Sequence, residues 1–337
     1  MSGNPMQLVC PAGSPPALRT AIDQGADAVY LGFRDRTNAR AFPGLNFSDA
    51  DIATGVAYAH ARGRKVYVAL NTWPSPAGLA AWRSAVDRAA ALRVDAIICA
   101  DVGVLDYAAH QHPGLPRHLS VQASATTHVA LRYYRERFGI ARAIIPRVLS
   151  VQQVERLCAQ DIVPIEVFAF GSLCIMVEGR CQLSSYVTGE SPNRHGMCSP
   201  PKFVHWDEEP GGVRRVSLNG CVIDRFGPDE PAGYPTVCKG RYAVAGEIFH
   251  ALEEPTSLNT LDLLPRLQAA GVAALKIEGR QRGQAYVGAV TSIWRQALDR
   301  LAAGAGPWTS DEAWQRELAR LAEGHQTTLG PYHRSWH

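Results

Sequence analysis

Four cysteines in the second half of the chain have the residue type and the setting of metal ligands. Cys174, Cys181, Cys198 and Cys238 are separated by gaps of six, sixteen and thirty-nine residues, in a region rich in Gly and Pro. Thiolate is the soft ligand that both zinc and iron–sulfur clusters select. Structural zinc sites usually contain two cysteines about two to four residues apart, and this sequence has no Cys-x-x-Cys pair. The spacing therefore favours an iron–sulfur cluster and leaves zinc as the alternative.

The remaining four cysteines have other settings. Cys10 and Cys99 lie in apolar runs expected to be strands, and Cys158 lies in a run expected to be a helix. We interpret these three as buried, inert thiols, because free cysteine is among the most buried residue types. Cys221 is an alternative to Cys238 as the fourth ligand. Disulfides are disfavoured because the first residues do not resemble a secretion signal, and we expect a reducing, cytoplasmic location.

The residues around the first two of these cysteines form a longer pattern, E-x-F-x-x-G-S-L-C-x4-G-x-C-x-L-S. It is present at Glu166, Phe168, Gly171, Ser172, Leu173, Cys174, Gly179, Cys181, Leu183 and Ser184. This pattern resembles the signature of the collagenase-like peptidase family of unknown catalytic type. The stretches 30–40 and 275–280 extend the likeness over about residues 7–301, to the short members of that family that act in ubiquinone biosynthesis.

The resemblance implies a [4Fe–4S] cluster held by Cys174, Cys181, Cys198 and Cys238, and it favours Cys238 over Cys221. It also implies a hydroxylase component that acts on the ubiquinone precursor ring without oxygen. Prephenate would be the oxygen donor, and a UbiV-like member of the same family would be the partner in a heterodimer. Other members of the family are RNA-modifying hydroxylases, and the family name implies a peptidase. A fourth alternative is a metal site that is purely structural.

The chain alternates apolar β-prone runs with helical runs, and this alternation predicts a (β/α)8 TIM-barrel-like α/β fold in residues 1–302. The expected strands are 7–12, 28–33, 65–71, 95–101, 118–123, 142–147, 164–171 and 272–279. The expected helices are 15–24, 48–62, 76–92, 126–138, 150–160, 262–271, 284–301 and 310–322. The alternation stops over residues 172–258, which we interpret as an iron–sulfur insertion after the seventh strand. Residues 303–337 are expected to be a C-terminal helix and tail.

Local signals specify two of the helix starts and one pair of charges. Ser48 and Asp51 have the spacing of a capping box, and Asp262 is expected to cap the helix that ends near residue 271. Glu166 on the seventh strand and Lys276 on the eighth both point inward by the two-residue period of a strand. We expect them to pair, because buried charges are rarely unpartnered.

Polar and basic residues gather at the ends of the expected strands, where barrel enzymes perform their chemistry. The substrate-binding residues that we predict are Arg36, Asn38, Arg40, Arg147, Glu278 and Arg280. A guanidinium group offers planar, bidentate recognition of carboxylates and phosphates. We therefore expect a small anionic substrate between these residues and the cysteines. No residue type or spacing identifies the catalytic residues.

The overall composition restricts the function classes. With 46% hydrophobic and 19% charged residues, the sequence is that of an ordinary folded protein. The net charge of +3 is too small to indicate nucleic-acid binding by itself. No apolar run approaches the length of a membrane span.

Overall fold

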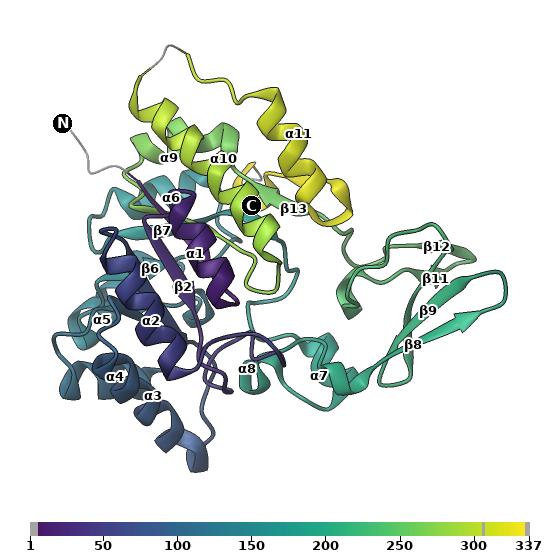
Figure 1. The fold of residues 1–337 in the computed structure, drawn as a ribbon, viewed down its shortest axis with the longest axis horizontal. Coiled ribbons are helices and arrows are strands. Elements are labelled where there is room, and N and C mark those ends of the chain that lie inside the picture. Colours follow the sequence, from purple (N-terminus) through teal and green to yellow (C-terminus); the bar gives the residue numbers. More distant parts are fainter. Residues whose placement is uncertain (1–5, 305–306, 334–337) are drawn as a thin grey trace.

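A computed structural model describes residues 6–304 and 307–333, and eight parallel strands in this part of the chain form a closed barrel (Figure 1). The strands are β1 (Gln7–Pro11), β2 (Ala28–Leu31), β3 (Lys65–Leu70), β4 (Ala96–Cys99), β5 (Arg117–Leu119), β6 (Arg142–Ile144), β7 (Ile165–Ser172) and β14 (Ala274–Ile277). Each strand pairs in parallel with the next, and β14 closes the barrel by pairing with both β7 and β1. The predicted TIM-barrel-like fold is therefore confirmed.

Helices follow the strands and cover the outside of the barrel (Figure 1). They are α1 (Pro15–Asp23), α2 (Asp49–His60), α3 (Leu79–Ala91), α4 (Val102–Gln111), α5 (His128–Phe138), α6 (Val151–Cys158), α9 (Leu264–Ala269) and α10 (Gln284–Ala302). All residues of β2 and β4 are buried, because side chains on both faces of these strands meet other side chains. Helix α4 was not predicted. Asp101, just after β4, caps α4 by accepting from the Val104 amide at 3.0 Å.

The two predicted helix starts have different outcomes. The capping box at α2 is confirmed, because Ser48 accepts from the Asp51 amide at 3.1 Å and Asp51 accepts from the Ser48 amide at 3.0 Å. The prediction for Asp262 is wrong. Helix α9 has Leu263 at its N-cap without a side-chain bond, and a 3-10 turn precedes it. The Asp262 carboxylate instead accepts from the Ser310 hydroxyl at 2.5 Å, so it ties the C-terminal segment to the barrel.

The cysteine-bearing insertion leaves the barrel after β7 and projects from it as two small sheets, to the right in Figure 1. It contains α7 (Gln182–Thr188), α8 (Pro192–His195), β8 (Val204–Glu209), β9 (Val213–Leu218), β10 (Cys221–Phe226), β11 (Tyr242–Val244) and β12 (Glu247–Phe249). Strands β8, β9 and β10 form one antiparallel sheet, and β11 and β12 form a hairpin. Val216, Leu218, Ile223 and Val237 give the insertion a small hydrophobic core of its own.

The chain returns to the barrel through β13 (Ser257–Asn259), which runs antiparallel to β7. Strand β15 (Thr327–Thr328) then pairs with β13, so part of the C-terminal segment joins the main sheet. Helix α11 (Glu312–Leu321) precedes it, and short 3-10 helices cover Pro76–Gly78, Val121–Ala123, Pro201–Phe203, Val237–Lys239, Leu261–Leu263, Glu323–His325 and Gly330–His333. Tyr332 is buried and donates its hydroxyl to the Phe168 carbonyl at 3.2 Å. Of the expected tail, residues 305–306 and 334–337 lie outside the described residues.

A charge network fills the barrel at the end where the strands begin. Glu166 accepts from Lys276 Nζ at 3.0 Å, which confirms the predicted pair, and also from Arg142 Nη1 at 3.1 Å. Arg142 donates in addition to the Gln7 side chain at 2.6 Å. Burial would raise the pKa of Glu166, but the two cations hold it at about 2. Burial lowers the pKa of the neighbouring His118 to about 3, so this imidazole is neutral.

Candidate functional site at the mouth of the barrel

The four cysteines of the predicted ligand set stand in the insertion as two pairs. Cys174 follows the end of β7 by two residues, and Cys238 lies in the 3-10 turn Val237–Lys239. Burial, and then the neighbouring Cys174, raise the pKa of Cys238 to about 12. Cys181 is the N-cap of α7 and its sulfur accepts from the Ser184 amide at 3.3 Å. Burial raises the pKa of Cys181, and Cys198 beside it adds to that effect.

The donor set fits an iron–sulfur cluster in its chemistry, since four free thiols come from consecutive segments of one insertion. The four thiols lie as two neighbouring pairs, Cys174 with Cys238 and Cys181 with Cys198. Within residues 6–304 and 307–333, no three His, Cys, Asp or Glu side chains are arranged as ligands of one metal ion. Thiols with raised pKa values are protonated at neutral pH, and they must lose their protons before they bind a metal. Cys10 and Cys99 are fully buried in the barrel, whereas Cys221 is exposed at the start of β10.

The loop between Cys174 and Cys181 is fastened to the barrel by two arginines. Arg147, which follows β6, forms an ion pair with Glu178 at 3.6 Å. Arg180 donates to the Gln122 carbonyl at 3.2 Å, on the loop after β5. Gly179 lies between these contacts with φ +75°, and a Cβ atom there would lie 2.6 Å from the Gln122 side chain. The signature glycine is therefore required by the close approach of the loop to the barrel.

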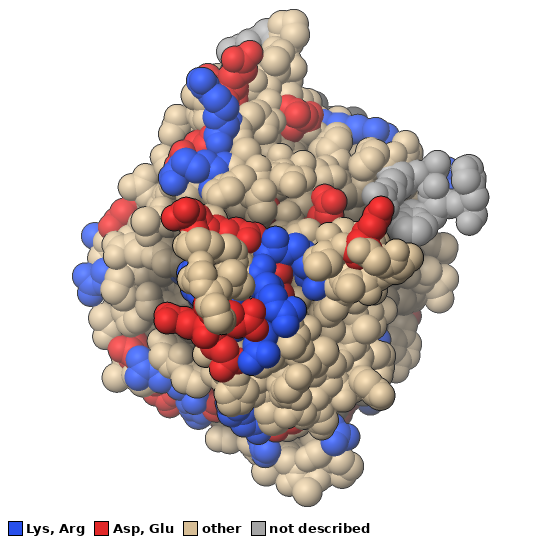
Figure 2. Space-filling view, turned by 90° about the vertical axis from the view of Figure 1, so that its right-hand side faces the viewer, with Lys and Arg blue, Asp and Glu red and all other residues tan. Residues whose placement is uncertain are grey.

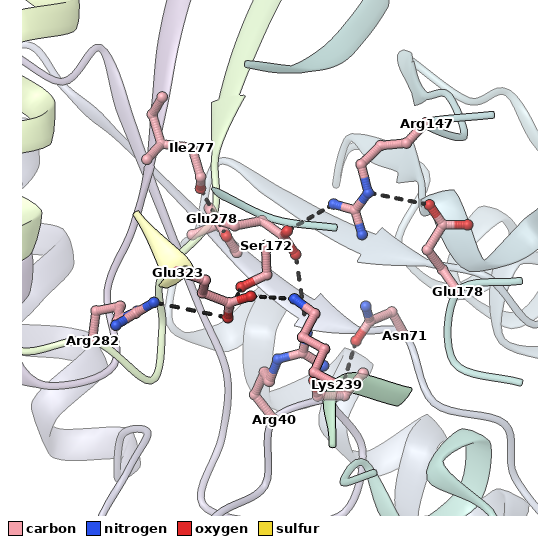
Figure 3. A network of polar contacts seen from close by, with 12 residues as sticks. Arg40, Asn71, Arg147, Ser172, Glu178, Lys239, Ile277, Glu278, Arg282 and Glu323 are labelled. Carbon is pink, nitrogen blue, oxygen red and sulfur yellow. Dashed lines mark hydrogen bonds and ion pairs between the residues drawn. The ribbon is translucent and has the colours of Figure 1, made fainter. Parts of the chain in front are cut away.

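Arg147 is also the centre of an ionic chain at the mouth of the barrel (Figure 3). Its Nη1 atom lies 2.7 Å from Glu278 Oε2, and its guanidinium group stacks 4.2 Å above the Phe168 ring. Arg40 approaches the other oxygen of Glu278 at 4.0 Å. Arg147 is 8% exposed, whereas Arg40 is partly open to solvent. The loop after β2 and the ends of β6 and β14 thus meet at Glu278.

Arg280 is a buried cation whose hydrogen-bond partners are uncharged. Its Nη1 atom donates to the amide oxygens of Asn38 at 2.9 Å and of Asn46 at 3.4 Å. Its guanidinium carbon lies 5.8 Å from the centre of the Tyr30 ring. Burial is the main cause that lowers the pKa of Arg280 to about 10, and the nearby Arg40 adds to it. A buried guanidinium group without a carboxylate on it in the described part of the chain is suited to bind a carboxylate of a substrate.

Arg36 lies apart from the other five predicted substrate-binding residues. Its guanidinium group stands 5.6 Å from the Trp82 ring, outside the ionic chain of Arg147. It lines a cavity of about 510 Å³ between the loop after β2 and the segment of the insertion that carries Cys198. Asn46, which accepts from Arg280, lines the same cavity. Of the predicted substrate-binding residues, Arg36 therefore lines this cavity and not the ionic chain of Arg147.

Several residues of the site were not found from the sequence. Glu323 accepts from the Ser172 hydroxyl at 2.5 Å and forms ion pairs with Lys239 and Arg282 (Figure 3). Glu253 contacts the cysteine loop, because its amide donates to the Cys238 carbonyl at 3.1 Å. These contacts join segments that are far apart in the chain, so no short sequence motif predicts them. Glu178 alone had a signal, since it lies within the cysteine signature.

The contacts of Ser172 and His195 bear on a peptidase mechanism, which needs a nucleophile and a base within hydrogen-bond reach. Ser172 donates to Glu323, and the His195 ring bonds the Ser191 carbonyl at 3.1 Å on its own helix. These two residues are therefore not joined as nucleophile and base. Among the described residues, no helix has both the length and the apolar character needed to cross a membrane.

Comparison with known proteins gives the family. A profile described as peptidase family U32 matches residues 13–334. "tRNA hydroxylation protein P" of Escherichia coli is 31% identical over 88% of this chain and 69% of its own length. "Collagenase" of Porphyromonas gingivalis is 29% identical over 95% and 72%. The solved U32 peptidase Mk0906 is 16% identical, covers 83% of this chain and 95% of its own, and has a TM-score of 0.49. The chain therefore belongs to peptidase family U32.

Proposed function

We propose that this chain is an iron–sulfur component of oxygen-independent hydroxylation, of the UbiU type, that acts on the ubiquinone precursor ring in the cytoplasm. The observation that carries the proposal is the position of the four cysteines. Cys174 lies near Arg147, which pairs with Glu278 at 2.7 Å at the mouth of the barrel. The loop after β2 at the same mouth holds Arg280, a buried guanidinium group whose hydrogen-bond partners among the described residues are uncharged. A UbiV-like protein of the same family is the proposed partner in a heterodimer, and prephenate is the proposed oxygen donor.

Each part of the mouth has a role in this proposal. A [4Fe–4S] cluster held by Cys174, Cys181, Cys198 and Cys238 supplies one-electron chemistry. Arg280 binds a carboxylate of the donor, which suits prephenate because that molecule is a dicarboxylate. Glu278 accepts from Arg147 at 2.7 Å, so this ion pair fixes both side chains at the mouth. Glu278 does not accept a hydrogen bond from Arg280, which therefore stays available to the donor. The apolar side chain of Phe168, under Arg147, excludes water from this side of the mouth.

Replacing Arg280 by Ala is expected to weaken prephenate binding at least tenfold, because a charge-assisted contact contributes about 1.5–3 kcal/mol. Arg280→Lys keeps the charge but loses the planar fork, and it should fall between wild type and Arg280→Ala. Titration calorimetry without oxygen measures the affinity. Arg320→Ala is the control, since the ion pair of that exposed side chain in the described part of the chain lies within its own helix, with Glu317 at 2.7 Å. Equal affinities of wild type, Arg280→Ala and Arg40→Ala would contradict the role of these arginines.

The experiment that tests the proposed function compares quinones in a deletion strain grown with and without oxygen. Loss of this protein is expected to abolish ubiquinone only in the absence of oxygen, because hydroxylases that use molecular oxygen replace it in air. Return of ubiquinone with the wild-type gene, and not with a Cys174→Ala variant, ties the effect to the cysteine site. Unchanged ubiquinone in the anaerobic deletion strain would overturn the proposal.

Hydroxylation of RNA is the second candidate function, and the names of the relatives favour it. Besides the E. coli protein, "tRNA hydroxylation protein P1" of Bacillus subtilis is 27% identical over 96% of this chain and 70% of its own length. On the other side, Figure 2 shows acidic and basic side chains interspersed on the face toward which the insertion projects. On β8 and β9 of the insertion, Arg215 pairs with Asp207 at 3.0 Å and with Glu209 at 3.4 Å. Such pairing interrupts the positive track that RNA phosphates require.

The same deletion strain discriminates between the two candidates. Its transfer and ribosomal RNA would be digested to nucleosides and compared with wild type by mass spectrometry. The ubiquinone proposal predicts identical nucleosides. A missing hydroxylated nucleoside together with unchanged anaerobic ubiquinone would establish the RNA function instead.

A further inference from the structure

Glu323, in the segment after α11, bridges two loops of the cysteine site (Figure 3). One carboxylate oxygen accepts from the Ser172 hydroxyl at 2.5 Å, and the other is paired with Lys239 Nζ. Arg282 approaches the first oxygen at 3.8 Å. The side chains of Glu323 and Lys239 are 25% and 12% exposed, so both lie mostly out of solvent.

The backbone around Glu323 is fixed independently of its carboxylate. Its amide donates to the Ser257 hydroxyl at 3.0 Å, at the start of β13. The next residue, Gly324, has φ +59°, and a Cβ atom there would lie 2.2 Å from the Pro255 carbonyl oxygen. Only glycine fits this close approach without a shift of the backbone. The C-terminal segment therefore presents the Glu323 side chain from a defined position.

The two loops that Glu323 joins carry one of the two cysteine pairs. Ser172 precedes Cys174 by two residues, and Lys239 directly follows Cys238. Cys174 and Cys238 are the pair in which one thiol raises the pKa of the other. These two residues come from opposite ends of the insertion, sixty-four positions apart in the chain. Within the insertion, Glu253 contacts both loops, since its amide donates to the Cys238 carbonyl at 3.1 Å and its carboxylate accepts from the Ile175 backbone. Glu323 adds a second link between the same loops, and this link comes from the C-terminal segment.

We infer that Glu323 is a positioning residue that holds Cys174 and Cys238 together through Ser172 and Lys239. This inference rests on the proposed function, because the two cysteines need to be held together in order to bind the cluster. The contacts of Glu323 that support it are contacts between protein side chains. The C-terminal segment is thus part of the cysteine site, although its own sequence contains no metal ligand of that site.

Labelling of each cysteine by iodoacetamide tests this role in the full-length protein without a metal. The native protein is incubated with the reagent under reducing-agent-free, oxygen-free conditions, and mass spectrometry follows each cysteine with time. In Glu323→Gln, the labelling rates of Cys174 and Cys238 are expected to rise roughly tenfold or more, the range for a lost charge-assisted hydrogen bond. Cys181 and Cys198, the other pair, should keep their wild-type rates.

Two further variants separate position from charge. Removing a negative charge can itself speed labelling, because it lowers the pKa of nearby thiols. Glu323→Asp keeps the charge, but its shorter side chain cannot reach Ser172 and Lys239 together, so it should also label faster at Cys174 and Cys238. Glu317→Gln is the matched control on the same segment. Among the described residues Glu317 pairs with Arg320, at 2.7 Å, and with no other cation, so this variant should behave as wild type.

The reconstituted protein gives a second readout, the rate at which a chelator removes iron. Glu323→Gln and Glu323→Asp are expected to lose iron faster than wild type and Glu317→Gln. Wild-type rates at Cys174 and Cys238 in Glu323→Asp would overturn the inference, and so would equal acceleration at all four cysteines. A wild-type protein that binds no iron would refute the proposed cluster, while the labelling of the metal-free protein would still decide the role of Glu323.

Discussion

Alanine at any one of Cys174, Cys181, Cys198 or Cys238 is expected to remove most or all of the iron from the purified protein. A [4Fe–4S] cluster uses four thiolates, and loss of one leaves an iron without its protein ligand. The four ligands lie in the insertion as two neighbouring pairs, Cys174 with Cys238 and Cys181 with Cys198. Iron and acid-labile sulfide per chain, measured after purification without oxygen, are the readout.

The other cysteines supply matched controls for this prediction. Cys10→Ala and Cys99→Ala change thiols that are fully buried in barrel strands, and the iron content should stay at the wild-type level. Cys221→Ala is the sharper control, because Cys221 was the alternative fourth ligand and lies in the same insertion. If Cys221→Ala loses the iron and Cys238→Ala retains it, the ligand assignment is wrong.

Removal of the Glu166 carboxylate is expected to cause the largest loss of stability. Glu166→Ala leaves Lys276 and Arg142 without the carboxylate that each contacts inside the barrel, at 3.0 and 3.1 Å. Breaking a buried ion pair from one side costs about 3–5 kcal/mol, because a charge remains buried and uncompensated. The free energy of unfolding, from urea titrations of the metal-free protein at pH 7, measures this loss.

The pH dependence and an exposed pair provide the controls. The folded-state pKa of Glu166, about 2, lies below its ordinary value of 4.5. The carboxylate therefore stabilises the fold above about pH 4.5, and this contribution is lost as the pH falls toward 2. The difference between wild type and Glu166→Ala should shrink over that range. Glu155→Ala breaks an exposed pair with Arg266 and should cost at most about 1 kcal/mol. A similar loss in both variants at pH 7 would contradict the account.

The barrel was predictable because its signal is repeated. Each strand is a short apolar run, and each run is followed by a helical pattern and a cap such as Ser48 with Asp51. Helix α4 was not predicted because only one polar residue, Asp101, separates its apolar start at Val102 from the apolar run of β4. Asp101 is the start signal of that helix, because its side chain accepts from the Val104 amide.

The candidate site was predictable where it follows from strand ends or from the cysteine signature. Arg147 meets Glu278, and Arg280 meets Asn38 of the loop after β2, because the strands of a barrel all end on one face. Part of the insertion also had a local signal, since Asn219-Gly220 is the two-residue turn that joins β9 and β10. Glu323 could not be found in this way. Its partner Ser172 lies 151 positions away, and the choice of partner depends on how the C-terminal segment packs.

The measurement that tests the central claim most directly is the metal content of the wild-type protein. The protein would be purified without oxygen, iron, zinc and acid-labile sulfide would be quantified, and the absorption spectrum would be recorded. A [4Fe–4S] cluster on Cys174, Cys181, Cys198 and Cys238 predicts about four iron and four sulfide per chain, with a broad absorption band near 400 nm that reduction bleaches. One zinc per chain without sulfide, or no metal at all after reconstitution, would contradict it.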